Sequence, residues 1–207
     1  MVFVTQSIEK PQVITFEQFV QQKPDDSYYE LHEGVIYPVP QPRGKHEEIT
    51  GFVAGIITNE YLRLQLPYLI VKTALVKVSD KETAYSPDVL VLNRTNLINE
   101  PLWEQASTVQ QADSIPLVVE VVSTNWRLDY LTKLKDYEEI GIKEYWIVDY
   151  LGLGAKRLIG NPKQPTVMVH SLVEGEYLVN LFRGNQRVVS PTFPELEVTA
   201  NQIFQAN

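Results

Sequence analysis

The stretch PLVVEVVS, residues 116–123, places one carboxylate, Glu120, inside a run of apolar β-forming residues. The valines on either side of Glu120 favour a buried strand. A buried strand accommodates an ionised side chain only when an opposite charge or a cation compensates it, because burying an unpaired charge is costly. Asp88 repeats the pattern, since it opens the apolar run VLVL at residues 89–92. Two acidic residues on two core-type strands, with a lysine nearby, predict a metal site.

Outward from this strand, the sequence predicts a βαβ unit. A charged helical segment is expected over residues 128–140 and ends at Gly141, a typical helix-terminating residue. The run EYWIVD, residues 144–149, predicts a second buried strand. Strands joined by such a helix should be parallel. The apolar stripe of the helix is expected to comprise Leu128, Leu131, Leu134 and Tyr137.

The N-terminal half predicts mainly local elements. Thr15 is expected to cap a short helix over residues 15–19, and residues 24–27 form a turn cluster. The remaining expectations are a hairpin over residues 28–31 and 34–39, a long amphipathic helix over residues 45–64, and a β-rich run over residues 68–78 that pairs antiparallel with residues 89–92. Residues 93–114 are polar and without clear periodicity, which indicates a surface excursion able to cover a site.

The C-terminal part predicts an antiparallel meander with strands at residues 155–159, 166–170, 176–182 and 186–189. We therefore expect an α/β fold (α+β in looser usage) with a central mixed sheet flanked by helices and a C-terminal antiparallel β-meander. No Pro/Gly/Ser-rich linker divides the 207 residues. The chain is thus expected to be one domain, residues 1–207, with its core at about residues 15–150 and the meander at about residues 151–207.

Composition narrows the functional classes. The chain has 44% hydrophobic residues, enough for a full core, and no cysteine, which excludes disulfides and thiolate metal sites and favours an intracellular protein. The first residues, MVFVTQ, lack the pattern of a signal peptide, and no apolar segment approaches the roughly 18 residues of a membrane span. We expect a cytoplasmic protein without a membrane partner. The net charge of -8 disfavours non-specific nucleic-acid binding, so DNA would need a local basic patch or a metal.

The predicted site suits phosphodiester hydrolysis. Mg²⁺ takes one or two carboxylates plus waters, and Asp88 and Glu120 could supply them. A lysine beside the metal could orient or deprotonate the attacking water and stabilise phosphate charge. Lys133 and Lys135 are two positions apart on the expected helix and point about 200° from each other, so only one can face the site. Asp129 could hold Lys133 through an i,i+4 pair.

These residues resemble the PD-(D/E)xK nuclease superfamily, and more narrowly the Uma family of restriction-endonuclease-like bacterial proteins. The resemblance spans about residues 15–204. Its motifs are Pro87-Asp88, Glu120-Val-Val-Ser123, Asp129, Lys133-x-x-x-Tyr137, Gly141-Ile-Lys-Glu-Tyr-Trp-Ile-Val-Asp149, Tyr29-Glu30-Leu31-x-x-Gly34 and His46-x-x-Ile49. One position departs from the superfamily pattern, which expects a lysine two residues after the second acid, where this chain has Val122. Lys133 matches the place on the following helix to which the Uma family moves that lysine.

The resemblance implies a Mg²⁺- or Mn²⁺-dependent DNA endonuclease of restriction-endonuclease-like fold. Asp88 and Glu120 would hold the metal and Lys133 would assist the nucleophilic water. The accessory candidates are Glu30, His46, Asp129 and Lys135, and the candidate nucleic-acid contacts are the Arg43–Lys45 loop, the 93–114 excursion, Lys72, Lys77 and Arg127. Because enzymes that cut both strands often present two sites, we expect a homodimer.

Other interpretations remain open at this level. Asp88 could simply end a turn, Lys133 could be a solvated residue paired with Asp129, and Lys135 could lie on the surface. His46 could be a helix cap or edge contact, and Glu30 a structural partner. The alternative function is a non-catalytic interaction or regulatory domain on the same fold, which the net charge and the displaced lysine favour. A carbohydrate-binding β-protein is a further class, against which the βαβ unit argues.

Overall fold

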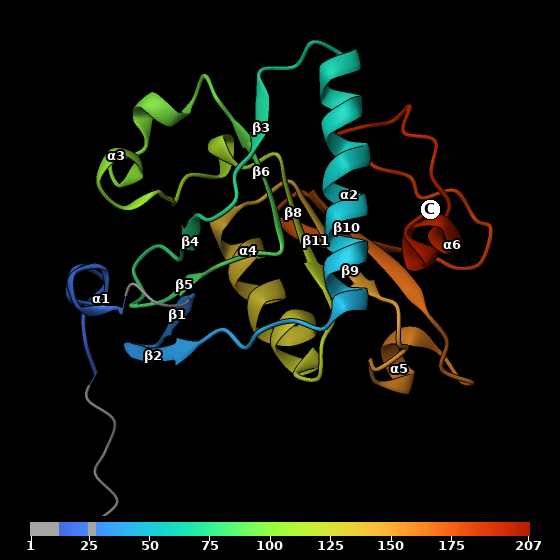
Figure 1. Ribbon diagram of the computed structural model, residues 1–207, viewed down its shortest axis with the longest axis horizontal. Helices are drawn as coiled ribbons and strands as arrows, with labels where there is room; N and C mark the ends of the chain where they lie inside the picture. Colours follow the sequence, from blue (N-terminus) through green and yellow to red (C-terminus); the bar gives the residue numbers. More distant parts are fainter. Residues whose placement is uncertain (1–12, 25–27) are drawn as a thin grey trace, which may run out of the picture.

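The computed structural model describes residues 13–24 and 28–207, and in that part of the chain the strands form a six-stranded and a five-stranded sheet (Figure 1). The larger sheet has the order β11-β10-β9-β8-β6-β3 and the smaller one β2-β1-β5-β4-β7. The strands of the larger sheet are β3 (Tyr68–Ile70), β6 (Val89–Asn93), β8 (Leu117–Val121), β9 (Glu144–Asp149), β10 (Thr166–Val173) and β11 (Glu176–Phe182). Mixed sheets with flanking helices confirm the expected α/β class.

The predicted βαβ unit forms the centre of the larger sheet. Strand β8 pairs parallel with β9, and Glu120 lies opposite Ile147. Every residue of both strands is buried. Along β8 the side chains alternate between the two faces of the sheet. Val119 and Val121 pack into the core cluster of one face, whereas Val118 and Val122 pack into the cluster of the other.

Helices cover both faces. Helix α2 (Gly44–Arg63) packs Ile49, Val53 and Ile57 against the first face, together with the C-terminal helix α6 (Ala200–Gln205). Two successive helical segments, η3 (Leu128–Lys133) and α4 (Leu134–Ile140), cover the second face. Glu120 lies two residues from both Val118 and Val122, so its side chain points toward the second face, where η3 and α4 lie.

The smaller sheet brings the N-terminal elements beside this centre. It contains β1 (Tyr29–His32), β2 (Val35–Pro38), β4 (Leu75–Lys77), β5 (Ala84–Tyr85) and β7 (Thr108–Val109). Helix α1 (Phe16–Gln22) packs on it, and Thr15 forms the predicted cap as a full capping box with Gln18. The β1–β2 hairpin is confirmed, and it turns at Glu33 and Gly34, both with positive φ. Strand β1 pairs with β5, and β5 is followed directly by Ser86 and Asp88. The smaller sheet therefore places Glu30 of β1 beside the predicted metal site.

The β-rich run at residues 68–78 was predicted as one strand, and this is wrong. Residues 68–70 pair with β6 as expected, but residues 75–77 belong to the other sheet, where they pair with β5 and β7. The chain crosses between the sheets at exposed residues 72 and 73, and the uniform β-forming composition hides that crossing.

The 93–114 excursion likewise contains more structure than predicted. It holds η1 (Leu97–Asn99), α3 (Trp103–Ala106), η2 (Ala112–Ser114) and the buried strand β7.

The helix after β8 also differs from its prediction. Its first six residues, Leu128–Lys133, are π-helical, and the regular helix begins only at Leu134. Of the expected apolar stripe, Leu131 is 43% exposed and does not face the sheet, whereas Tyr137 is buried and Leu134 packs against the cluster of the second face. The inward face is instead polar and aromatic: Asp129, Tyr130, Lys133, Asp136 and Tyr137 are all buried. A π-helical turn inserts one residue per turn and shifts which side chains face inward, a shift that a 3.6-residue period does not predict.

The C-terminal strands continue the larger sheet, because β10 pairs antiparallel with β9 and β11 with β10. Two predicted strands are wrong. Residues 156–159 form helix α5 (Lys156–Ile159), and residues 186–189 contribute only an isolated bridge between Arg187 and Thr199. A short apolar run cannot by itself distinguish strand from helix.

The turn expected at residues 24–27 and the lead-in at residues 1–12 fall wholly or mainly outside the described residues. Among the described residues, no helix is both long and apolar enough to cross a membrane.

A buried histidine on β10 provides a stability prediction. His170 is 4% exposed and stacks on Tyr145, and burial lowers its pKa to about 4, although a bond to the Tyr145 carbonyl acts in the opposite direction. In the unfolded chain its pKa is about 6.5, so protonation favours unfolding as the pH falls from 6.5 toward 4. When the pH is lowered from 7.5 to 5, we expect the free energy of unfolding of the wild type to fall by about 2 kcal/mol more than that of His170→Phe. Urea unfolding at both pH values measures this, and equal losses would contradict it.

Candidate active site

The site is organised around Glu120, which is 3% exposed and receives two hydrogen bonds on the same oxygen, Oε1. The Lys133 amino group donates to it over 2.9 Å from the end of η3. The Tyr137 hydroxyl donates over 3.1 Å from α4. The lysine also lies 3.1 Å from Glu30 Oε1 on β1. Glu120 therefore joins residues from the larger sheet, the smaller sheet and the covering helix.

Asp88 reaches the same place from the segment that links β5 to β6. Its Oδ2 accepts a hydrogen bond of 2.7 Å from the backbone N–H of Val121, the residue after Glu120. The His46 Nε2, in the first turn of α2, lies 2.9 Å from the Val121 carbonyl oxygen and 3.4 Å from Asp88 Oδ2. The Asp88 side chain is 26% exposed, so the site opens to solvent at this carboxylate.

Of the two candidate lysines, Lys133 faces the site and Lys135 does not. Lys133 is 4% exposed and paired with carboxylates, and Asp129 Oδ1 lies 4.0 Å away as the predicted i,i+4 partner. The Lys135 side chain is 70% exposed and pairs with Glu139 at 3.4 Å on the helix surface. The accessory role suggested for Lys135 therefore has no support in the geometry.

The predicted nucleic-acid contacts are more dispersed. The Lys77 amino group, on β4 of the smaller sheet, lies 5.7 Å from the centre of the Phe16 ring of α1. The Lys45 amino group donates to Glu48 and to the Gln205 carbonyl. Arg127 is exposed, stacks on Trp126 at 4.7 Å and immediately precedes η3. Of these cations, Arg127 is the nearest in sequence to the buried residues of η3, and Lys72 lies exposed between the sheets.

Three carboxyl groups, those of Glu30, Glu120 and Asp129, lie within 4.0 Å of the Lys133 ammonium, and a fourth, that of Asp88, acts electrostatically on Glu120 and Asp129. Burial raises the pKa of Glu120 well above its usual range, against the pull of Lys133 and with the repulsion of Asp88 and Asp129. Burial likewise raises the pKa of Asp129 to about 7, again against the pull of Lys133. Burial also disfavours the charged form of Glu30, but Lys133, His32 and the Ser86 N–H together lower its pKa to about 2. The raised pKa values of Glu120 and Asp129 mean that one lysine does not compensate all of these carboxyl groups in their charged form.

Comparison with known proteins places the geometry in a family. A crystal structure described as that of a "putative nuclease belonging to DUF820", from Anabaena variabilis ATCC 29413, shares the fold with a TM-score of 0.70 and 20% sequence identity, covering 93% of this chain and 98% of that chain. No curated protein matches the chain. A model of the Uma2 family, described as "Putative restriction endonuclease", matches residues 16–201. The chain belongs to the Uma2 family. The resemblance inferred from the motifs is confirmed, and the family's description supports a nuclease function.

Within this Uma2 protein, the geometry accounts for the displaced lysine. Val122, where the superfamily pattern has lysine, is fully buried in the apolar cluster of the second face. Lys133 reaches Glu120 from the covering helix instead. An ammonium group is thus present beside the second acid, although it comes from a different element.

The motif analysis of this Uma2 protein named Tyr137 without giving it a role in the site, and it missed His32 and Tyr85. His32 Nε2 lies 2.8 Å from Glu30 Oε2, Tyr137 bonds Glu120, and the Tyr85 ring lies 5.4 Å from the Lys133 amino group. Tyr137 lies four residues after Lys133, a spacing that places both on one helix face and could have indicated its role. Tyr85 and His32 lie on strands of the smaller sheet and reach the site only because that sheet packs beside the larger one, so no local sequence pattern indicated them.

Proposed function

We propose that this protein is a divalent-metal-dependent endonuclease that hydrolyses DNA phosphodiester bonds, with Asp88 and Glu120 as metal ligands. One observation carries the proposal. Lys133 bonds the buried Glu120, and the partly exposed Asp88 bonds the backbone N–H of the next residue, Val121, close enough to act electrostatically on Glu120. This combination of carboxylates and an ammonium group suits chemistry on a phosphate.

The donor set fits a hard divalent cation. In the described ranges, no three acidic or histidine side chains enclose a metal by themselves. Mg²⁺, however, uses only one or two carboxylates and completes its coordination with waters and substrate phosphate oxygens. The excess of carboxylates over Lys133 also favours a cation electrostatically. Asp88 and Glu120 would therefore hold Mg²⁺ or Mn²⁺.

When bound, such a metal supplies Lewis-acid polarisation of the phosphate and lowers the pKa of a coordinated water. The protein residues supply position and charge. Lys133 stays protonated, because the adjacent carboxylates hold its pKa well above the usual range despite burial. It therefore stabilises negative charge on the phosphate and orients a water rather than removing its proton. Tyr137 and Glu30 fix the rotamers of Glu120 and Lys133 by direct contact.

We propose DNA as the nucleic acid and a homodimer as the active assembly, because enzymes that cut both strands of a duplex often present two sites. The net charge of -8 makes a diffuse electrostatic interface unfavourable. Binding would then depend on the metal and on local contacts such as Arg127.

A second candidate is a non-catalytic interaction domain on the same fold. The observation that favours it is the internal pairing of Lys133 with Glu120 and Glu30, which partly compensates the acids without any metal. The two candidates differ in one property, since only the nuclease binds a divalent metal through Asp88 and Glu120.

The proposal predicts that Asp88→Asn abolishes plasmid cleavage. We expect the wild type with Mg²⁺ or Mn²⁺ to convert supercoiled DNA into nicked or linear forms, and Asp88→Asn to be reduced at least about 100-fold, the scale for loss of one transition-state contact. Asp113→Asn is the matched control, because its side chain is 82% exposed and pairs only weakly, at 3.7 Å, with Lys143. Equal cleavage by wild type and Asp88→Asn would sink the proposal.

A further inference from the structure

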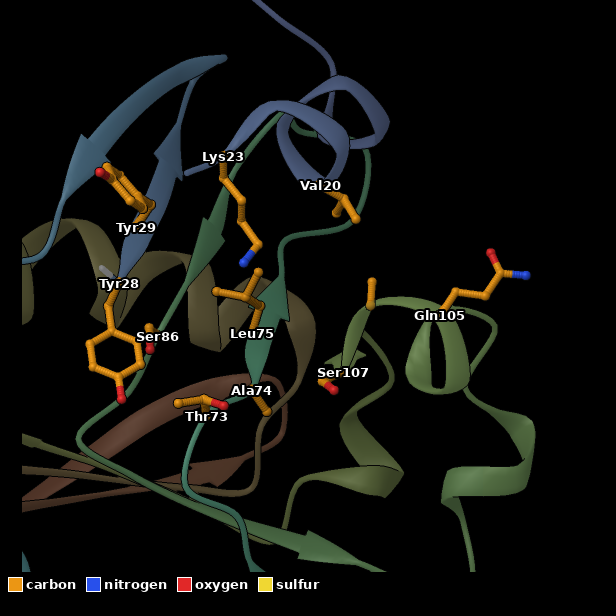
Figure 2. Close-up of a pocket in the computed structure, with 11 residues that line it drawn as sticks. Val20, Lys23, Tyr28, Tyr29, Thr73, Ala74, Leu75, Ser86, Gln105 and Ser107 are labelled. Atoms are coloured by element: carbon orange, nitrogen blue, oxygen red, sulfur yellow. The ribbon is translucent and has the colours of Figure 1, made fainter. Parts of the chain in front are cut away.

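A cavity of about 330 Å³ lies beside the candidate active site, between the end of α1, the starts of β1 and β4 and the end of α3 (Figure 2). Its lining residues are Val20, Lys23, Tyr28, Tyr29, Thr73, Ala74, Leu75, Ser86, Gln105, Ala106 and Ser107. The volume lies at the lower end of the roughly 300–1,000 Å³ range of ligand pockets. No role in the proposed hydrolysis has been assigned to it.

The cavity adjoins the site through two chain segments. Ser86, which lines it, donates its backbone N–H to Glu30 Oε1 over 3.0 Å, and Asp88 follows two residues later. Tyr29, another lining residue, precedes Glu30 on β1, and its side chain packs with the α1 cluster on the opposite face of the strand from Glu30. A molecule in contact with Ser86 would therefore lie close to Glu30 and to the chain segment that carries Asp88.

The lining provides three kinds of contact. Tyr28 is 50% exposed and presents an aromatic ring to the cavity, while the Lys23 amino group extends from the end of α1 toward Leu75 (Figure 2). Thr73, Ser86 and Ser107 add hydroxyl groups. One wall is held in place by the hydrogen bond of 3.0 Å from Leu75 N to Ser107 O.

We propose that this cavity binds one unpaired nucleotide of the substrate strand, adjacent to the phosphate that is cut. A nucleotide combines a flat base, which stacks on an aromatic ring, with an anionic phosphate for a lysine and sugar oxygens for hydroxyl groups. A base that remains stacked in a duplex cannot enter such a cavity, so the nucleotide must come from a single strand or be extruded. Stacking on Tyr28 makes the contact tolerant of base identity. The proposal rests on the proposed nuclease function and names the form of its substrate.

The test is fluorescence anisotropy of a labelled single-stranded DNA with Ca²⁺ as the divalent ion. We expect Tyr28→Ala and Lys23→Gln each to weaken binding at least tenfold, and Tyr28→Phe to bind within twofold of the wild type because the ring is retained. Tyr37→Ala is the matched control, since Tyr37 is also 50% exposed but is absent from the cavity lining. Lys143→Gln, whose side chain is 71% exposed and lies just before the start of β9, controls for the loss of one positive charge.

A base-free strand, made of abasic sugar-phosphate units, separates stacking from charge. Tyr28→Ala should have no effect on its binding, whereas Lys23→Gln should still weaken it. The proposal is overturned if the wild type binds neither strand, if Tyr28→Ala binds ordinary DNA as tightly as the wild type, or if it weakens both strands equally. Plasmid cleavage with unaltered binding by Tyr28→Ala would reject the cavity and keep the nuclease. If DNA binding depends on Tyr28 but the wild type cleaves no plasmid, the cavity is kept as a nucleotide-binding site and the nuclease function is rejected.

Discussion

Replacing Glu120 with glutamine is expected to lower plasmid cleavage by at least about 10³-fold, which corresponds to about 4 kcal/mol of transition-state stabilisation. The neutral amide keeps the shape of the side chain but removes the negative charge that a divalent cation needs. Stability should change little. Lys133 keeps Glu30 as a charged partner at 3.1 Å, so its ammonium group is not left uncompensated.

Glu144→Gln is the matched control for this variant. Glu144 is also a fully buried glutamate in the larger sheet, and burial raises its pKa. It lies at the opposite end of β9, bonded to Trp146 Nε1 and to the backbone N–H of Thr192. We expect Glu144→Gln to cleave plasmid at the wild-type rate. If both variants cleave as the wild type does, Glu120 is a structural acid and its assignment as a ligand is wrong.

Replacing Lys133 with methionine is expected to destabilise the fold by about 3 kcal/mol at neutral pH, because removing one partner of a buried ion pair leaves the other charge uncompensated. Lys133 is 4% exposed, and Glu120 and Glu30 both depend on it. Methionine retains most of the apolar stem, so the lost charge rather than a cavity should dominate. Urea unfolding measures the effect, and Lys135→Met, at a position with a 70% exposed side chain, should change stability by less than about 0.5 kcal/mol.

The double variant Lys133→Met/Glu120→Gln sharpens this prediction. With the buried carboxylate neutralised, part of the lost stability should return, so the two changes should be non-additive by at least about 1 kcal/mol. Strict additivity, or a Lys133→Met protein as stable as the wild type, would show that the ammonium group does not compensate these acids.

The sequence predicted the strand that carries Glu120, and its partners, well for a physical reason. An acid among valines has few stable solutions, so Glu120 alone indicated a buried strand with a charged partner. The short distance in sequence between β8 and β9 then required a parallel pair with a crossover helix. The local signals at Thr15 and at the β1–β2 hairpin were equally reliable, because capping and turn chemistry act between near neighbours.

The errors arose where long-range contacts override the local pattern. Leu131 was expected to face the sheet, but the segment begins as a π-helix, Leu131 is exposed, and Lys133 faces inward beside Tyr137 and bonds Glu120. The run at residues 68–78 has uniform β-forming character, yet its two ends join different sheets. No local property of that run indicates which strand each of its ends will pair with.

The site shows the same division. Asp88 and Glu120 could be named because each is an acid beside or within an apolar run, and Lys133 could be named because it matches the family motif. Glu30 and His46 were recognised only as accessory candidates, and the contacts of Glu30 with Lys133 and of His46 with Asp88 depend on how the smaller sheet and α2 pack against the larger one. The second acid and the lysine lie on different elements, so their pairing could be proposed from sequence but required the packing of the helix on the sheet.

The most direct test of the account is isothermal titration of Mn²⁺ into the wild-type protein and into Asp88→Asn and Glu120→Gln. We predict saturable binding to the wild type that is lost or weakened at least about tenfold in each variant, since each change removes one anionic ligand of a cation that uses only one or two. Heat that is equal in all three proteins, or absent from the wild type, would contradict the account. It would mean that Lys133 alone compensates the acids and that the fold serves as an interaction domain.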